Sequence, residues 1–318
     1  MNRTLLTARL PAAPGTERSD ASAAGAWAQL SPPPPGVFRI RPLSFEATAS
    51  YSERLSHAYR LTLPQLCDGL GISLSGHGAC PTAGLVLSPT AASRLADLGR
   101  IPMTHLTHAL PHLVQGGTPP TGPATARWRP TERRRQAVRA CTMCVRHHSH
   151  GATGTAWIHR PWHRLVCVRH QQAAPDPRLT STLYTGVVPE LAAAHHAHQP
   201  LQRHPRSANA WMAARAITTR WYDHQQHLTD RWHHRLRQLS SSNSQLDPAG
   251  NTSAVLLTRD LVTYPETVAL TRTLATLPRH RRAYPTHVLL SGIGHRLGLA
   301  HFSPAASDPL HTYLGSRP

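Results

Sequence analysis

The chain contains no lysine and few acidic residues. All 34 of its basic residues are arginine, against 15 Asp and Glu, and its formal net charge is +19 with histidine counted as neutral. A surface with this excess of positive charge attracts polyanions, and arginine suits nucleic acid because its planar guanidinium grips a phosphate or a guanine edge through two hydrogen bonds. The composition therefore predicts a nucleic acid partner, with DNA as the first choice.

The scarcity of carboxylates also argues against catalysis. The 15 acids are spread thinly over 318 residues and form no triad for two-metal DNA strand transfer. A nuclease of the His-Asn-His kind would need an asparagine soon after His147-His148, and none follows at a useful spacing. We therefore predict a binding protein and not an enzyme.

Long hydrophobic runs are missing too. No apolar stretch approaches the ~18 residues that a membrane-spanning helix needs. The apolar segment within Met1–Leu6 is too short for a signal peptide, and Arg9 and Pro11 follow it at once. The sequence thus favours a cytoplasmic protein without a membrane partner, in which Cys67 and Cys80 are reduced thiols.

The most specific pattern in the chain is a pair of short metal-ligand motifs. Cys141-Thr142-Met143-Cys144 is a CxxC, and a 22-residue spacer separates it from the CxxH of Cys167-Val168-Arg169-His170. Two residues between ligands allow a tight turn from which both side chains reach one ion, so two such knuckles close a tetrahedron. Three thiolates and one imidazole suit zinc and leave no open coordination position. We predict one structural zinc ion bound by Cys141, Cys144, Cys167 and His170.

The fourth ligand has competitors. Five other imidazoles lie close to the knuckles in the sequence and stay open as alternatives to His170: His147, His148, His150, His159 and His163. The alternative to a metal site is that the cysteines fall at this spacing by chance in a histidine-rich chain.

Composition and the residues that typically start and end helices divide the chain into four parts and predict a mainly α fold. Residues 1–37 are rich in Ala, Ser, Thr and Pro and are predicted to be a disordered tail. Residues 38–127 form an N-terminal helical domain and linker, with a Gly-rich loop over 72–86 and the linker over 115–127. A capping box at Thr62-x-x-Gln65 and the pair Ser88-Pro89 begin two of its helices. Two such helices joined by a tight turn would form a helix-turn-helix, and simple helix packing fits the sequence equally well.

The other two parts are a zinc-binding module over 128–185 and a C-terminal helical domain over 186–318. In the latter we expect a helix over 189–199 with its histidines in solvent, and one long amphipathic helix over about 207–239. Trp221 and Trp232 lie on the apolar stripe of the long helix, and its other side is basic. Thr263-x-x-Glu266 predicts a further capped helix.

The predicted nucleic-acid contacts are arginines near the knuckles and on the outer side of the long helix. They are Arg133, Arg134, Arg135, Arg160, Arg164, Arg169, Arg220 and Arg231. Trp157 and Trp162, between the knuckles, would either stack on nucleic acid or form the core of the small module, and the core role is favoured.

The order of these features resembles the TniQ family of transposition proteins, which includes the TnsD-type target selectors. The lead-in Arg39–Leu43, the helix ending Arg54–Ala58 and the following Leu63-x-x-Leu66 resemble its N-terminal region. The CxxC, the segment Trp157–Trp162 and the CxxH resemble its zinc module in order and spacing. Together they cover roughly residues 38–175.

Two features refine the resemblance. Pro189-Glu190 and Tyr264–Leu270 look like an actinobacterial-type branch. Thr142 and Val168 stand where such knuckles usually carry proline, and a further CxxC that relatives often have after the CxxH is missing. Only one zinc ion is therefore expected.

The resemblance implies a non-catalytic DNA-targeting adaptor of a transposition system. Such proteins recognise target DNA, or a guide-bound DNA complex, and recruit an AAA+ ATPase that engages the transposase. The same residues are compatible with a stand-alone zinc-containing DNA-binding transcriptional regulator, or with an interaction adaptor whose charge only keeps it in solution. A homodimer is compatible with the sequence as well.

Overall fold

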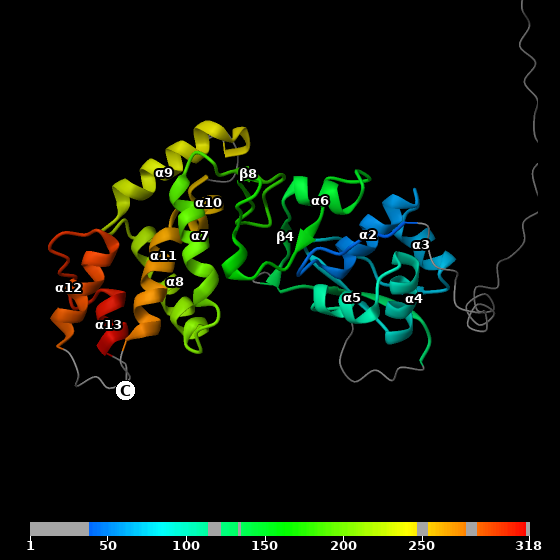
Figure 1. The fold of residues 1–318 in the computed structure, drawn as a ribbon, viewed down its shortest axis with the longest axis horizontal. Coiled ribbons are helices and arrows are strands. Elements are labelled where there is room, and N and C mark those ends of the chain that lie inside the picture. The colour runs from blue at the N-terminus through cyan, green and yellow to red at the C-terminus, as the bar shows by residue number, and fades with distance from the viewer. Residues whose placement is uncertain (1–37, 114–121, 133–134, 247–253, 278–284, 316–318) are drawn as a thin grey trace, which may run out of the picture.

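The computed structural model describes residues 38–113, 122–132, 135–246, 254–277 and 285–315. These residues are mainly α-helical, as predicted, and form an elongated molecule (Figure 1). An N-terminal lobe lies at one end and a helical C-terminal lobe at the other, with the two knuckles between them. The predicted tail, residues 1–37, lies outside the described part. None of the helices in the described ranges is long and apolar enough to cross a bilayer.

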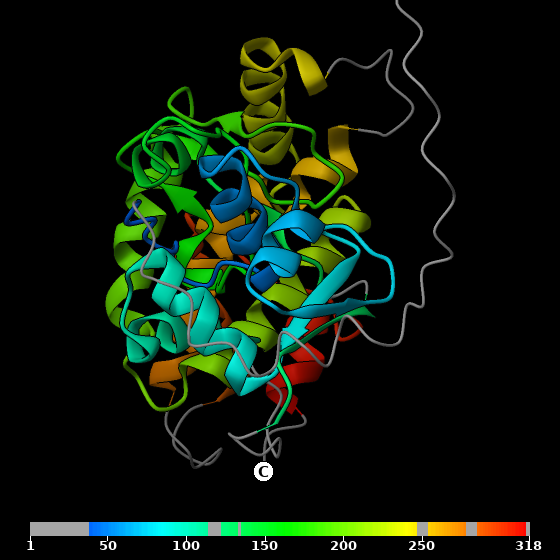
Figure 2. The ribbon, with the colours of Figure 1, turned by 90° about the vertical axis from the view of Figure 1, so that its right-hand side faces the viewer.

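The N-terminal lobe contains four short helices, which Figure 2 shows from the end of the molecule. They are α2 (Thr48–Ala58), α3 (Leu63–Gly69), α4 (Pro89–Gly99) and α5 (Met103–Ala109). The predicted capping box is present, because the side chains of Thr62 and Gln65 each accept a hydrogen bond from the backbone N–H of the other residue. Ser88 caps α4 by accepting from the backbone N–H of Ala91. The helix ends at Gly99, and the C-cap residue Arg100 that follows takes the left-handed conformation.

A three-stranded sheet completes this lobe, and here the sequence prediction was wrong. The supposed loop and linker contain β1 (Ser73–Ser75), β2 (Ala83–Leu87) and the start of β3 (Thr125–Pro130), in the order β1-β3-β2. Leu85 and Leu87 point into the core from β2, and β3 pairs parallel to β1 and antiparallel to β2. Their pairing partners lie roughly 40 residues or more apart, so local composition does not reveal the sheet.

A buried ion pair organises the lead-in to α2. Arg54 donates Nε and Nη2 to the two carboxylate oxygens of Glu46 at 2.8 Å each, and Nη2 also reaches the carbonyl of Arg41 at 2.9 Å. Glu46 accepts in addition from the backbone N–H of Leu43 and the hydroxyl of Ser50. Both charged side chains are almost fully buried, and each compensates the charge of the other in low dielectric, although Arg54 Nη1 has no hydrogen-bond partner among the described residues. The lead-in and α2 are thereby one structural unit.

The first knuckle is attached to this unit. It contains β4 (Val138–Arg139), α6 (Thr142–His148) and β5 (Trp157–Ile158). Ala47 donates its N–H to the carbonyl of Trp157 at 2.9 Å, and the N–H of Trp157 donates to the hydroxyl of Ser50 at 2.8 Å. Trp157 is buried, in agreement with the core role predicted for it.

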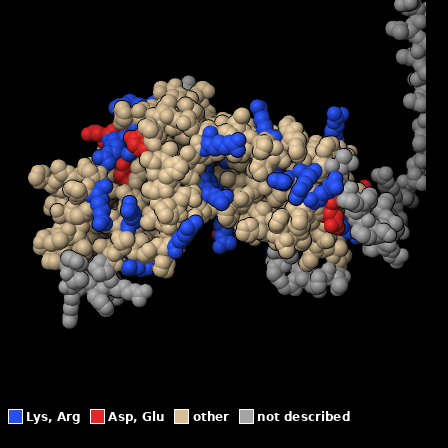
Figure 3. All heavy atoms as spheres, in the orientation of Figure 1, with Lys and Arg blue, Asp and Glu red and all other residues tan. Residues whose placement is uncertain are grey.

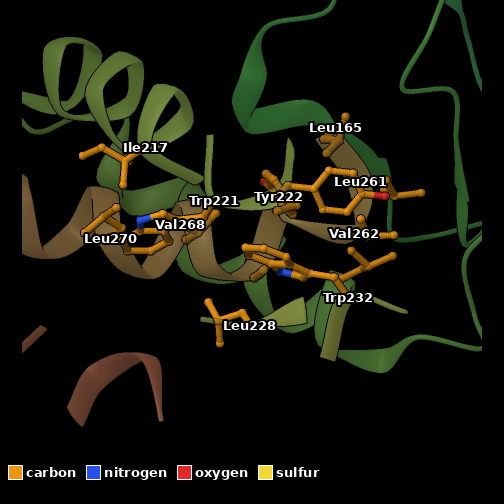
Figure 4. Packing of buried hydrophobic residues seen from close by; sticks show 14 of the residues in the cluster. Leu165, Ile217, Trp221, Tyr222, Leu228, Trp232, Leu261, Val262, Val268 and Leu270 are labelled. Carbon is orange, nitrogen blue, oxygen red and sulfur yellow. The ribbon is translucent and has the colours of Figure 1, made fainter. Parts of the chain in front are cut away.

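The C-terminal lobe is a bundle around α8 (Ser207–Asp223) and α11 (Tyr264–Thr276). Its other helices are α7 (Pro189–Leu201), α9 (Thr229–Ser242), α10 (Ala254–Val262), α12 (Thr286–Leu297) and α13 (Pro309–Gly315). Figure 4 shows Tyr222 and Trp232 beside Leu261 and Val262 in its core, and Trp221 beside Val268 and Leu270. The second knuckle packs on this core with η3 (Trp162–Arg164), β6 (Val166–Cys167), β7 (Gln172–Ala173) and β8 (Leu183–Tyr184).

The long helix predicted over 207–239 is two helices. Gln225 and His227, with φ of 51° and 59°, take the left-handed conformation and break the chain between α8 and α9. Trp221, Leu228 and Trp232 are all buried, as the apolar stripe predicted. Positions seven and eleven residues apart share a face of a straight helix, so this spacing does not reveal the break.

Two polar predictions in this lobe were also wrong. Glu266 does not close a capping box, because its carboxylate receives two hydrogen bonds from Arg235, at 2.7 and 2.9 Å, and one from Trp232 Nε1 at 3.0 Å. His198 is not solvated but buried, stacked on Trp211 with ring centroids 4.4 Å apart and hydrogen-bonded to the Tyr264 hydroxyl at 2.9 Å.

Candidate metal centre and nucleic-acid interface

The four predicted metal ligands meet at one point. Cys141, Cys144, Cys167 and His170 each offer one ligand atom, and all four atoms lie within 4.8 Å of one another. His170 Nδ1 is 3.3 Å from the sulfurs of Cys141 and Cys144 and 3.6 Å from that of Cys167. The sulfurs of Cys144 and Cys167 are 3.8 Å apart. These residues can bind a metal ion.

The spacing fits a tetrahedral ion. Bonds of ~2.3 Å to sulfur and ~2.0 Å to nitrogen place ligand atoms roughly 3.5–3.8 Å apart in a tetrahedron. The measured separations of 3.3 to 3.8 Å lie close to this range. None of the cysteines forms a disulfide, so the three sulfurs are available as thiolates.

Each pair of ligands lies on one short element of local structure, a helix start for the first pair and a tight turn for the second. Cys141 is the N-cap residue of α6 and Cys144 lies in its first turn. In the second knuckle, β6 ends at Cys167 and a turn closes when the N–H of His170 donates to the Cys167 carbonyl at 3.3 Å. The left-handed Gln171, with φ of 50°, then starts the return along β7.

A polar layer surrounds the ligands. Cys141 Sγ lies 3.1 Å from Gln172 Oε1, which also accepts from the hydroxyl of Thr182 at 3.1 Å. Thr182 in turn contacts the hydroxyl of Thr142 at 3.5 Å. In this contact the Cys141 thiol donates to Gln172 Oε1, so Gln172, Thr182 and Thr142 form a polar chain beside this ligand. Sequence reasoning missed Gln172, whose only signal is its position two residues after His170.

Hydrogen bonds within the cluster shift the pKa values of Cys144 and Cys167 in opposite directions. Hydrogen bonds from Cys141 and Cys144 hold the pKa of Cys167 well below its ordinary value. The pKa of Cys144 is raised because it keeps its proton in hydrogen bonds to Cys141 and Cys167. The arrangement therefore favours a thiolate at Cys167, and a thiolate is the form that binds metal.

The competing imidazoles make other contacts. His147 and His148 stack edge-on with each other, and His159 packs against His112 and lies 3.1 Å from the Arg135 carbonyl. His150 lies beside the Arg39 carbonyl and His163 packs against the buried His198. Among the described residues, His170 is the imidazole that the cysteines surround.

The two ligand pairs belong to different cores. Val145 and Ala140, beside the first pair, pack with Leu43 of the lead-in. Val166 and Ala173, beside the second pair, belong to the core of the C-terminal lobe. A bound ion would therefore link the two ends of the molecule, in addition to the chain that connects them.

A cationic cavity of about 490 Å³ adjoins the cluster at this junction. It is lined by Arg139, Arg160, Arg164 and Arg169 together with two histidines, and none of the described residues that line it is acidic. Arg164 and Arg169 are exposed. The guanidinium of Arg160 instead donates to the carbonyls of Leu165 and Ala174, at 3.1 and 2.7 Å, and burial lowers its pKa to about 10.

Arg139 was missed by sequence reasoning. Its guanidinium lies 4.3 Å from the ring centroid of Trp157, and its Nε is buried without a hydrogen-bond partner. Burial lowers its pKa. Its place two residues before Cys141 is the only signal in the sequence that it lies beside the metal ligands.

The other predicted arginines are dispersed. Arg133 and Arg134 lie outside the described residues, and Arg135 is exposed beside Glu132. Arg220 is exposed on α8, whereas Arg231 on α9 binds Glu266 and the Leu297 carbonyl. On the face in Figure 3 basic side chains occur along the whole length of the molecule, while acidic ones gather in two places.

Comparison with known proteins identifies the region that contains this geometry. The family model described as TniQ matches residues 37–173, from the lead-in through both knuckles. No curated protein and no solved structure matches the chain. Residues 37–173, less than half of the chain, therefore match the TniQ domain, and this match supports a TniQ family protein.

Proposed function

We propose that this protein is a non-catalytic, zinc-containing DNA-targeting adaptor of a transposition system. The observation that carries the proposal is the cavity beside the metal ligands, where four arginines converge without a carboxylate inside a TniQ domain. Its role is to bind DNA, or a DNA-bound complex, and to bring it to the AAA+ ATPase and transposase.

Zinc is the metal that this ligand set favours. Three thiolates and one imidazole at tetrahedral spacing are typical of structural zinc, and four protein ligands leave no position for a water or substrate. The ion would supply a cross-link between the knuckles. It would hold Arg164 and Arg169, which lie on the second knuckle side, against Arg139 on the first.

The charges at this junction suit a phosphodiester backbone. Arg164 and Arg169 are exposed and have no acidic partner among the described residues, so binding phosphate does not require breaking an ion pair. Arg139 adds a buried donor, Nε, that has no hydrogen-bond partner among the described residues. Exposed Arg220 and Arg135 are further proposed contacts away from the cavity, and Arg133 and Arg134, which lie outside the described residues, stay proposed contacts from the sequence alone. Arg160 and Arg231 contribute charge but are tied to the protein by hydrogen bonds.

The test is the salt dependence of DNA binding. Arg164→Ala combined with Arg169→Ala should weaken binding to a random-sequence duplex and reduce the slope of log affinity against log salt by ~2, because two phosphate contacts are lost. Fluorescence anisotropy over a salt series measures both quantities.

The matched control is Arg127→Ala with Arg129→Ala. These two exposed arginines lie on β3, away from the cavity, and the double variant removes the same charge. Equal loss of slope in both double variants would show that only net charge matters and would remove the basis for a specific interface. Co-purification of the wild-type chain with an AAA+ ATPase of a transposition system then tests the transposition assignment separately.

A further inference from the structure

The C-terminal lobe contains a groove that the metal centre and its cavity do not explain. It has a volume of about 910 Å³ and lies among α7, α9, α11 and the end of α12. This volume is in the range of sites that hold ligands, roughly 300–1,000 Å³. Its lining includes small side chains, among them Ala193, Ala197 and Ala269. Such a lining allows a bound chain to approach the helices closely.

A buried charge pair forms part of the wall. Arg235 and Glu266 line the groove although their side chains are only 4% and 3% exposed. The two terminal nitrogens of Arg235 donate hydrogen bonds to the Glu266 carboxylate and the Val262 carbonyl, but its Nε has no hydrogen-bond partner among the described residues. Glu190 Oε1, at 3.8 Å, is beyond hydrogen-bond distance. The groove therefore contains a buried donor that a ligand acceptor can satisfy.

The opposite part of the groove is cationic. Arg272 and Arg296 are exposed there, and no described acid pairs with either. Arg296 Nη1 donates to the hydroxyl of Thr273 at 3.2 Å, which holds its guanidinium at the rim. The exposed carboxylate of Glu190 lies on the other wall. A ligand that fits must present a negative group to the arginines and a hydrogen-bond donor to Glu190.

We propose that this groove binds an acidic peptide segment of a protein partner. A peptide supplies a side-chain carboxylate for Arg272 and Arg296, a backbone carbonyl for Arg235 Nε, and a backbone N–H for Glu190. A DNA backbone supplies acceptors alone, and the carboxylates of Glu190 and Glu266 in the same groove repel it. The groove shares Arg231 with the proposed DNA contacts, but the peptide contacts are assigned to Arg235, Arg272, Arg296 and Glu190, so the inference goes beyond the proposed function.

The experiment selects ligands from a displayed library of random peptides on the immobilised full-length protein. The recovered peptides should be enriched in Asp and Glu. A selected peptide, labelled for fluorescence anisotropy, should bind Arg272→Glu/Arg296→Glu at least ~10-fold more weakly because two attractive contacts become repulsive. Ala197→Trp should weaken binding as well, since an indole at this exposed lining position takes up the space that the peptide would occupy.

Two controls lie on exposed positions outside the groove. Arg237→Glu alters charge on α9 and Ala216→Trp adds an indole on α8, and both should leave affinity unchanged. Recovery of peptides without acidic enrichment, or equal binding by the groove variants and the controls, would overturn the proposal. So would competition by a short DNA duplex for the same arginines, which would reassign the groove to nucleic acid.

Discussion

Removing the metal should loosen the junction between the lobes while leaving both large cores folded. Cys141 and Cys144 are held on the side of the lead-in, and Cys167 and His170 on the side of the C-terminal lobe. Neither the core around α2 and α4 nor the core around α8 and α11 contains a metal ligand. The perturbation is Cys144→Ser, or treatment of the wild-type protein with a chelator.

The expected magnitude follows from the loop that the metal closes. Cys144 and Cys167 are 23 positions apart, and cross-linking a loop of that length stabilises by about 3 kcal/mol on chain-entropy grounds. A loss of that size lowers the melting temperature of a 150- to 250-residue unit by about 6–12 °C. The transition of the C-terminal lobe, which contains the second knuckle, should shift by this amount.

Scanning calorimetry with metal analysis by mass spectrometry measures the effect, and limited proteolysis locates it. Cleavage should appear first between α6 and β5, residues 149–156, and between β7 and β8, residues 174–182. Cys80→Ser is the control, because Cys80 lies outside the cluster and its loss should leave the metal content unchanged.

Two results would refute this reasoning. A Cys144→Ser protein that keeps its metal or its melting temperature would show that the four residues do not form a stabilising site. Complete unfolding of the chain on chelation would show that the lobes depend on the metal and have no independent cores.

Two further predictions concern buried charge. Glu266→Gln should destabilise the C-terminal lobe by ~3–5 kcal/mol, because it leaves Arg235 charged and buried without its partner. Glu190→Gln is the control: its side chain is 49% exposed, so the free energy of unfolding should change by less than ~0.5 kcal/mol. Urea unfolding measures both free energies. Burial lowers the pKa of His198 to about 4, helped by the nearby His163 and His195, so the unfolded chain binds this proton more readily than the folded one. Stability should therefore be full above the ordinary histidine pKa of ~6.5 and fall by up to about 3 kcal/mol as the pH drops from there towards 4. His198→Gln should lack this component of the pH profile, and an unchanged profile would contradict the assignment.

Sequence reasoning found the parts of the molecule that depend on neighbouring residues. The capping box at Thr62 and the cap at Ser88 are local hydrogen-bond patterns and were predicted in place. The knuckles were found for the same reason, because two residues between ligands define a turn regardless of the rest of the fold. The apolar stripe through Trp221 and Trp232 also identified buried positions correctly.

It failed where a residue's role depends on a distant partner. Glu266 has the sequence of a capping residue, but Arg235 and Trp232, more than 30 positions away, offer its carboxylate better hydrogen bonds in the core. The strands β1 and β2 read as a loop because their partner β3 is far along the chain. The break after α8 was invisible because both resulting helices keep the same apolar spacing.

The amino-acid sequence by itself determined the three cysteine ligands, the helical character and the positive charge, since each of these follows from residue type and short spacing. Only the tertiary structure decided which histidine joins the cysteines, which arginines converge beside them, and that the ligand pairs sit on separate cores. Those features depend on packing between residues far apart in the chain, because buried polar groups take whichever partners the fold brings within hydrogen-bond distance.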